Sequence, residues 1–183
     1  MFSNFVLSRG RKRPVPAFFS FSTVFALNSY AEPHNLNNFA AAIFSQPNFN
    51  TNTGMMETLT TNNITVSVET EYLAAHSNPR EGKFIFNYHI TIENGSPHTV
   101  QLLRRHWIIV DSSGTLREVE GEGVVGLQPV LAPGEVHGYS SFCNQDTEIG
   151  KMSGTYLMTR VDDGSQFEAS IPEFKMVAPF KLN

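Results

Sequence analysis

The sequence has 183 residues and a formal net charge of −4 at pH 7, which is enough chain for one ordinary domain with a sizeable core. The charge is unevenly divided: residues 1–54 hold four basic residues and one acidic residue, so the remainder carries a net −7. An acidic remainder excludes nucleic acid as the main partner, because neutralising phosphates needs clustered Lys and Arg. We expect a cytoplasmic protein that binds neither nucleic acid nor membrane.

Residues 1–54 differ from the rest of the chain, because they hold nine of the fifteen Phe residues and show no helical or strand periodicity. The basic run at 9–13, the apolar stretch at 15–27 and small residues at 29 and 31 have the layout of a secretory signal. We favour a mis-assigned start, with Met55 or Met56 as the true first residue, or a disordered extension; a secretory signal or an organelle-targeting peptide within residues 1–31 is the alternative. Where residues 1–54 are part of the protein, we expect them to be disordered, because they have no packing partners.

From Ile64 onward the pattern is that of β-structure. Residues 64–68 alternate apolar and polar, and Phe84 to Ile92 form the clearest strand, with one aromatic and aliphatic face. Further strands are expected at 100–110, 115–120, 127–131, 136–143, 152–161 and 166–171, with an apolar tail at 172–183 that packs on the domain. Seven or eight short strands without an amphipathic helix predict one all-β sandwich over residues 57–183.

The most distinctive stretch is a glycine loop at residues 121–126. Gly121, Gly123 and Gly126 match the G-x-G-x-x-G pattern of dinucleotide-binding turns. That pattern requires a helix directly after it, and Pro129 and Pro133 prevent one. No Lys comes next as in a P-loop, so the loop is either a structural or partner-binding turn, which we favour, or a nest of backbone N–H groups for an anion.

The one basic cluster in the acidic part is Arg104-Arg105-His106, next to Trp107. In a strand, Arg105 should share a face with Leu103 and Trp107, whereas Arg104 and His106 should face the other way. Arg105 could stack on the indole or bind an anion bidentately. Cross-strand pairing of this cluster with acidic residues of the returning strand is the interpretation we favour.

Those acidic residues are Glu118, Glu120 and Glu122, at alternate positions. They could place carboxylates for Mg²⁺, but a solvated strand face is the favoured interpretation, and their charge opposes phosphate at the glycine loop. The histidines lack metal-site spacing, so no metal site is predicted. The single cysteine, Cys143, excludes an internal disulfide and is expected to be a passive residue on a strand.

Several segments closely resemble the ApaG family: QLLRRHW at 101–107, EVEGEGVVGLQP at 118–129, LAPGE at 131–135, MSGTY at 152–156 and IPEF at 171–174. The resemblance covers about residues 57–183. It implies an immunoglobulin- or fibronectin-III-like β-sandwich. The bacterial family is often encoded beside a diadenosine tetraphosphate hydrolase, and similar eukaryotic domains occur in F-box and polymerase-interacting proteins as interaction modules. The family has no agreed enzymatic activity, although nucleotide binding and a link to divalent-metal tolerance have been suggested.

The sequence therefore favours a non-enzymatic binding module that recognises a protein partner and has no cofactor beyond weak Mg²⁺ or Co²⁺ binding. The alternative is a nucleotide- or pyrophosphate-binding protein, or a metal-dependent phosphate-ester hydrolase, using Arg104 and Arg105 with metal on Glu118 and Glu120. The candidate ligand- or partner-binding residues are Arg104, Arg105, Trp107, Gly121, Gly123 and Gly126.

Overall fold

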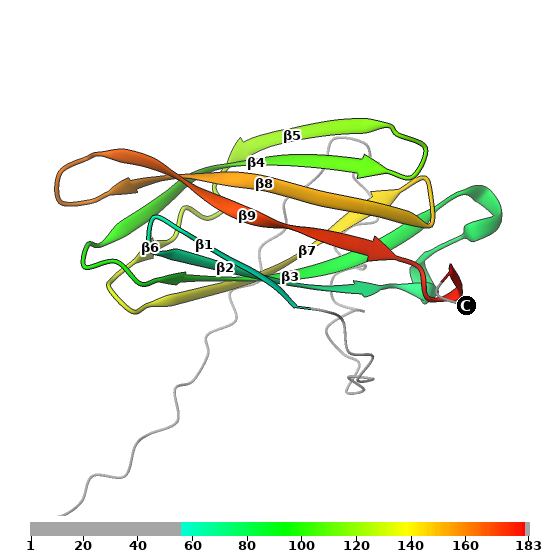
Figure 1. Cartoon of the computed structure of the whole chain (residues 1–183), viewed down its shortest axis with the longest axis horizontal. Coiled ribbons are helices and arrows are strands. Elements are labelled where there is room, and N and C mark those ends of the chain that lie inside the picture. The colour runs from blue at the N-terminus through cyan, green and yellow to red at the C-terminus, as the bar shows by residue number, and fades with distance from the viewer. Residues whose placement is uncertain (1–55, 182–183) are drawn as a thin grey trace, which may run out of the picture.

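The computed structural model describes residues 56–181 as two packed antiparallel sheets (Figure 1). The predictions for residues 1–54 lie outside the described residues. One sheet has the order β1 (Glu57–Thr61), β2 (Ile64–Tyr72), β3 (Phe84–Asn94), β7 (Val136–Gln145). The other has the order β5 (Leu116–Glu122), β4 (Val100–Asp111), β8 (Ile149–Arg160), β9 (Gln166–Val177), and the short β6 (Val130–Leu131) also pairs with β4. The predicted all-β sandwich is confirmed.

Helical structure within residues 56–181 is limited to three short 3₁₀ turns, η1 (Ala74–His76), η2 (Pro79–Glu81) and η3 (Pro179–Lys181). No helix in this part of the chain is long and apolar enough to cross a membrane. The fold is therefore held together by strand pairing and by the core between the two sheets.

The core forms where the inward faces of the two sheets meet. The alternation predicted for β3 is confirmed, because its apolar residues from Phe84 to Ile92 are buried. Trp107 of β4 lies at the centre, with its ring centroid 5.6 Å from that of Tyr88, 6.0 Å from Phe174 and 6.4 Å from Tyr156. Edge-to-face rings at these separations add to the hydrophobic burial that holds the sheets together.

Two elements differ from the sequence-based expectations. The sequence pattern does not predict strand β1, which reaches β2 through Asn62 and Asn63, whose φ angles of 53° and 61° are those of a tight hairpin turn. The last strand does not end at residue 171 but continues through Pro172 to Val177. It does so because its register with β8 shifts between Met152 and Gly154, and such an irregularity tolerates a proline in a strand. The tail thus packs on the domain, as predicted, but as a strand.

The two long sides of the sandwich differ. On one side β1 and β2 pack against β9. On the other side Arg117 of β5 reaches across to β7, where its guanidinium donates to the carbonyl oxygen of Asn144 at 2.6 Å. The glycine loop at residues 121–126 begins in the last two residues of β5, so it is on this second side of the sandwich.

Candidate functional site

The glycine loop is a closed hairpin turn. Val124 and Leu127 exchange two backbone hydrogen bonds, N–H of 124 to O of 127 at 2.8 Å and N–H of 127 to O of 124 at 3.0 Å. The two residues between them, Val125 and Gly126, have φ angles of 50° and 77°, which is the geometry of a two-residue hairpin turn with positive φ. The N–H of Gly123 donates to the carbonyl oxygen of Leu103 at 2.8 Å. Two of the N–H groups that residues 121–126 could offer to an anion, those of Gly123 and Val124, are thus engaged within the protein.

Gly123 occupies a position that no other residue fits. Its φ is 56°, and a Cβ built on it would lie 2.0 Å from the backbone oxygen of Leu127. The close approach lets the chain turn back at once, so that Val124 and Val125 are buried, with 1% and 8% of their surface exposed. The loop therefore contributes side chains to the end of the core.

Arg105 lies directly opposite Gly121 in the pairing of β4 and β5. Its guanidinium covers Gly121, because a Cβ on that glycine would lie 2.9 Å from two of the guanidinium nitrogens. The same guanidinium donates to the carbonyl oxygens of Glu122 at 3.0 Å and Gly123 at 2.9 Å. Arg105 thus fixes the start of the glycine loop, and Gly121 leaves the space for it.

Trp107 does not reach the surface, because only 3% of it is exposed. Arg105 is half-buried on the same strand, as the alternation predicted, but Leu103 does not share that face. The register of β4 with β8 shifts between Leu102 and Arg104, and Leu102 is the buried leucine instead. The prediction for Leu103 is wrong, because such an irregularity interrupts the period-2 alternation.

The opposite face of β4 and β5 points to solvent and carries charge pairs. Arg104 lies 3.5 Å from Glu120, and the Nε2 atom of His106 lies 2.9 Å from Glu118. These are the cross-strand pairs that the sequence favoured, although each pair is diagonal, since Arg104 stands opposite Glu122 in register. All of these groups are substantially exposed, so each pair contributes only about 0.2–1 kcal/mol.

This outward face also contains apolar side chains. Leu116 is 57% exposed and lies directly opposite Val110 in the strand pairing. Ile108 is the next outward residue of β4, and it stands opposite Glu118. We call this surface the β4–β5 outer face, defined by Ile108, Val110, Leu116 and the acidic row Glu118, Glu120 and Glu122.

Comparisons with known proteins identify the family of this chain. The ApaG domain family matches residues 74–160. The Protein ApaG of Ectopseudomonas mendocina (strain ymp) is 46% identical over 120 residues, which are 66% of this chain and 94% of that relative. The Protein ApaG of Brucella abortus (strain S19) is 46% identical over 124 residues, 68% of this chain and 95% of that relative. The chain belongs to the ApaG family.

Solved structures show the same similarity. A crystal structure of a protein described as ApaA from Bordetella pertussis has 43% sequence identity and a TM-score of 0.62, and the match covers 63% of this chain and 94% of that chain. A second X-ray structure has 40% identity and a TM-score of 0.62, with 67% and 92% covered. Both solved structures thus match this chain over more than nine-tenths of their own length.

The chemistry available in this ApaG-family domain is limited. Within residues 56–181, no group of three or more His, Cys, Asp or Glu side chains is close enough to hold a metal ion. Cys143 is buried on β7, and burial raises the pKa of its thiol to about 11, so little of the reactive thiolate forms at neutral pH. The Tyr139 and Tyr156 hydroxyls meet at 2.5 Å in the core, and burial raises the pKa of both.

Sequence reasoning missed Arg117, whose guanidinium joins β5 of one sheet to β7 of the other. No local pattern could have indicated its role, because the partner carbonyl at Asn144 is 27 residues away in sequence. The other side chains that sequence reasoning singled out fall into two groups. Arg105 and Trp107 point inward, and Arg104 lies on the outer face.

Proposed function

We propose that this ApaG-family domain is a non-enzymatic binding module that recognises a protein partner through the β4–β5 outer face. The observation that carries the proposal is the exposure of Leu116, which stands 57% exposed beside the acidic row. Fully burying a leucine side chain is worth about 1.5–3 kcal/mol, so a partner that covered Leu116 together with Val110 opposite it on β4 would gain binding energy from that burial.

The chemistry of the face indicates what kind of partner would fit. Three carboxylates, Glu118, Glu120 and Glu122, stand at alternate positions against one guanidinium, that of Arg104. A partner with basic side chains beside an apolar one would complement both the charge and Leu116. We therefore infer a protein segment with Lys or Arg residues flanking an aliphatic or aromatic side chain.

The nucleotide-binding alternative has weaker support. The Arg105 guanidinium donates to the carbonyl oxygens of Glu122 and Gly123, and the N–H of Gly123 donates to the carbonyl oxygen of Leu103. Arg104 remains accessible, but its nearest charged neighbour is Glu120, and the rest of the acidic row surrounds it with negative charge. A phosphate group would have to overcome that repulsion.

The proposal is tested by affinity capture with the full chain immobilised and exposed to an extract of its own cells. The test variant combines Glu118→Lys, Glu120→Lys and Glu122→Lys. The matched control combines Glu69→Lys, Glu71→Lys and Glu93→Lys, which makes the same change of charge at exposed positions of the other sheet. Unfolding curves of both variants establish that each is folded.

We expect a protein that the wild type and the control variant retain and the test variant loses. Retention should also weaken as salt is raised, because exposed charge pairs are screened within about 10 Å at 0.1 M. Equal retention by all three proteins would reject the β4–β5 outer face as the binding surface. If a protein is retained as expected, its dissociation constant should be measured with the wild type and with the Leu116→Asp variant. We expect weaker binding by the variant.

A further inference from the structure

A polar pocket of about 220 Å³ lies at one end of the sandwich, away from the outer face of β5. Its walls come from three turns: Asn62 and Asn63 between β1 and β2, residues 96–98 between β3 and β4, and Arg160 and Phe167 beside the β8–β9 turn. Figure 1 shows these turns gathered at the same end of the two sheets. Neither the sequence patterns nor the proposed function uses this pocket.

The β1–β2 turn is tied to both of the other elements by hydrogen bonds. The N–H of Gly95 donates to the carbonyl oxygen of Asn63 at 2.8 Å. The side-chain amide of Asn62 donates to the carbonyl oxygen of Glu168 on β9 at 2.9 Å. This wall of the pocket is therefore fixed to the β3–β4 loop on one side and to β9 on the other.

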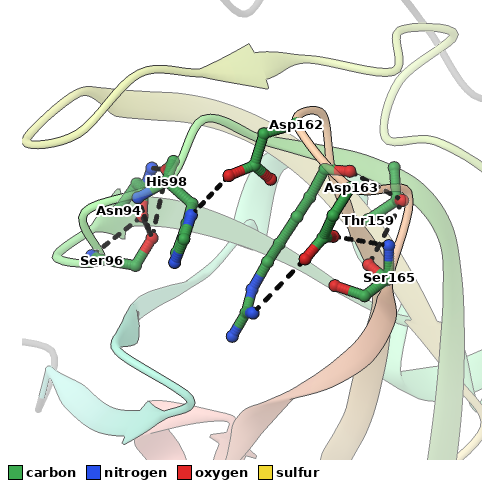
Figure 2. A network of polar contacts seen from close by, with 8 residues as sticks. Asn94, Ser96, His98, Thr159, Asp162, Asp163 and Ser165 are labelled. Atoms are coloured by element: carbon green, nitrogen blue, oxygen red, sulfur yellow. Dashed lines mark hydrogen bonds and ion pairs between the residues drawn. The ribbon is translucent and has the colours of Figure 1, made fainter.

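The β3–β4 loop and the β8–β9 turn are also joined directly. The N–H of Val161 donates to the carbonyl oxygen of Thr99 at 2.9 Å, and Nδ1 of His98 lies 2.7 Å from a carboxylate oxygen of Asp162. Figure 2 shows the imidazole of His98 directed at Asp162 from the neighbouring loop. The three turns thus form a closed, mutually hydrogen-bonded ring around the pocket.

Asn94 holds the β3–β4 loop from beneath. It is fully buried, and its side-chain amide donates to the carbonyl oxygens of His98 at 2.8 Å and Leu131 at 3.0 Å. Its side-chain oxygen accepts from the N–H of Ser96 at 3.0 Å and from the Ser96 hydroxyl at 2.7 Å (Figure 2). A loop fixed in this way keeps its shape without a ligand, so binding requires little further ordering.

Arg160 supplies the charge of the pocket. Its guanidinium lies 3.9 Å from the Asp163 carboxylate, which is beyond hydrogen-bond distance, and within residues 56–181 no closer polar contact to it is found. Asp163 accepts from the N–H of Ser165 at 2.8 Å instead, and hydrogen bonding to Ser165 holds the pKa of its carboxyl below the usual range. A guanidinium carries five N–H donors, so Arg160 keeps unused capacity to bind an anion at the pocket wall.

The residues around Arg160 indicate what kind of anion the pocket would bind. Arg160 is accompanied by Asp162 and Asp163, so a ligand with several negative charges would meet more repulsion here than a ligand with one. A single carboxylate matches the planar fork of a guanidinium. Phe167 offers an apolar wall to the group that carries the carboxylate. The volume lies below the roughly 300–1,000 Å³ of common ligand pockets, which suits one residue-sized group.

We propose that this pocket binds a small carboxylate that is attached to an apolar or aromatic group, with Arg160 pairing with the carboxylate. Such a group could come from a free organic acid or from the C-terminal residue of a peptide. This proposal is independent of the β4–β5 outer face, and its test does not depend on whether a partner binds there.

The test is a titration of the isotope-labelled full chain monitored by amide NMR. The probes are N-acetylphenylalanine, its uncharged amide, and a glycine-rich peptide that ends in phenylalanine. The variants are Arg160→Gln and, as the matched control, Arg80→Gln, which neutralises an exposed arginine of η2. The spectra themselves show whether each variant is folded.

We expect saturable shifts at residues 62–63, 96–98 and 160–167 with the acid, and binding about tenfold or more weaker for the amide or for the Arg160→Gln protein. The Arg80→Gln protein should bind as the wild type does. Tighter binding of the peptide than of the free acid would identify a protein C-terminus as the source, and equal binding would favour a free acid. The absence of saturable shifts, or equal binding of the amide, would overturn the proposal.

Discussion

Replacing Gly123 by alanine tests whether the glycine loop is a built structural turn. The new methyl group would lie 2.0 Å from the backbone oxygen of Leu127, and the residue would keep a φ of 56°. Gly114 provides the matched control, because its φ is 86° and a Cβ there would meet nothing within 4 Å. Both substitutions share the backbone strain, and only Gly123→Ala adds the collision.

The expected difference results from these two contributions. A left-handed backbone costs a residue with a Cβ about 1–2 kcal/mol, which is the whole expected effect of Gly114→Ala. Forcing an extra carbon into a packed position costs about 1–3 kcal/mol more, so Gly123→Ala should lose about 2–5 kcal/mol in all. Urea unfolding of both variants of the full chain measures the difference in free energy of unfolding. If Gly123→Ala were no less stable than Gly114→Ala, the structural interpretation of the loop would be refuted.

Three further predictions concern interactions in the interior. Arg105→Ala should lower the free energy of unfolding by about 1–3 kcal/mol, because two loop carbonyls lose their donor, whereas Arg104→Ala should cost less than about 1 kcal/mol in the same urea assay. Tyr139→Phe and Tyr156→Phe should each cost about 1–3 kcal/mol, and the double variant should cost less than their sum; strict additivity would contradict the buried hydroxyl pair. Burial raises the pKa of Cys143 from 9.0 to about 11, so its contribution to stability is full below pH 9 and is lost as the pH rises through about 11. Stability measured from about pH 8 to about pH 11 should therefore fall less in Cys143→Ala than in the wild type, and parallel curves would contradict this.

The fold class could be predicted because the strands of a β-sandwich leave a local signal in the sequence, the alternation of apolar and polar residues. The alternation from Phe84 to Ile92 matches the observed burial, since a strand with one buried face must repeat every two residues. Strand β1 escaped prediction because its side chains are mostly exposed and carry no apolar face. Its only local signal was the Asn62-Asn63 pair, whose positive φ angles form the hairpin turn.

The candidate site was predictable only in part. The charge pairs of Arg104 and His106 could be expected from strand pairing, which places neighbouring residues of a hairpin together. The inward hydrogen bonds of Arg105 could not be derived, because they depend on the path of the glycine loop. The pocket beside Arg160 could not be predicted, because Asn62 and Arg160 in its walls are about 100 residues apart in sequence and meet only in the folded sandwich.

Thermal unfolding of the full chain against a panel of anions tests the central claim most directly. The panel contains nucleotides, dinucleoside polyphosphates and pyrophosphate, each with and without Mg²⁺ or Co²⁺, with the ions alone as controls. A ligand at 100 times its dissociation constant adds about 2.7 kcal/mol, which is a shift of several degrees for a domain of this size. Because Arg105 and the glycine loop are engaged in the fold and the acidic row repels phosphate, we predict no shift. A shift of several degrees that disappears in Arg104→Ala would contradict the account and establish a nucleotide or pyrophosphate site on this domain.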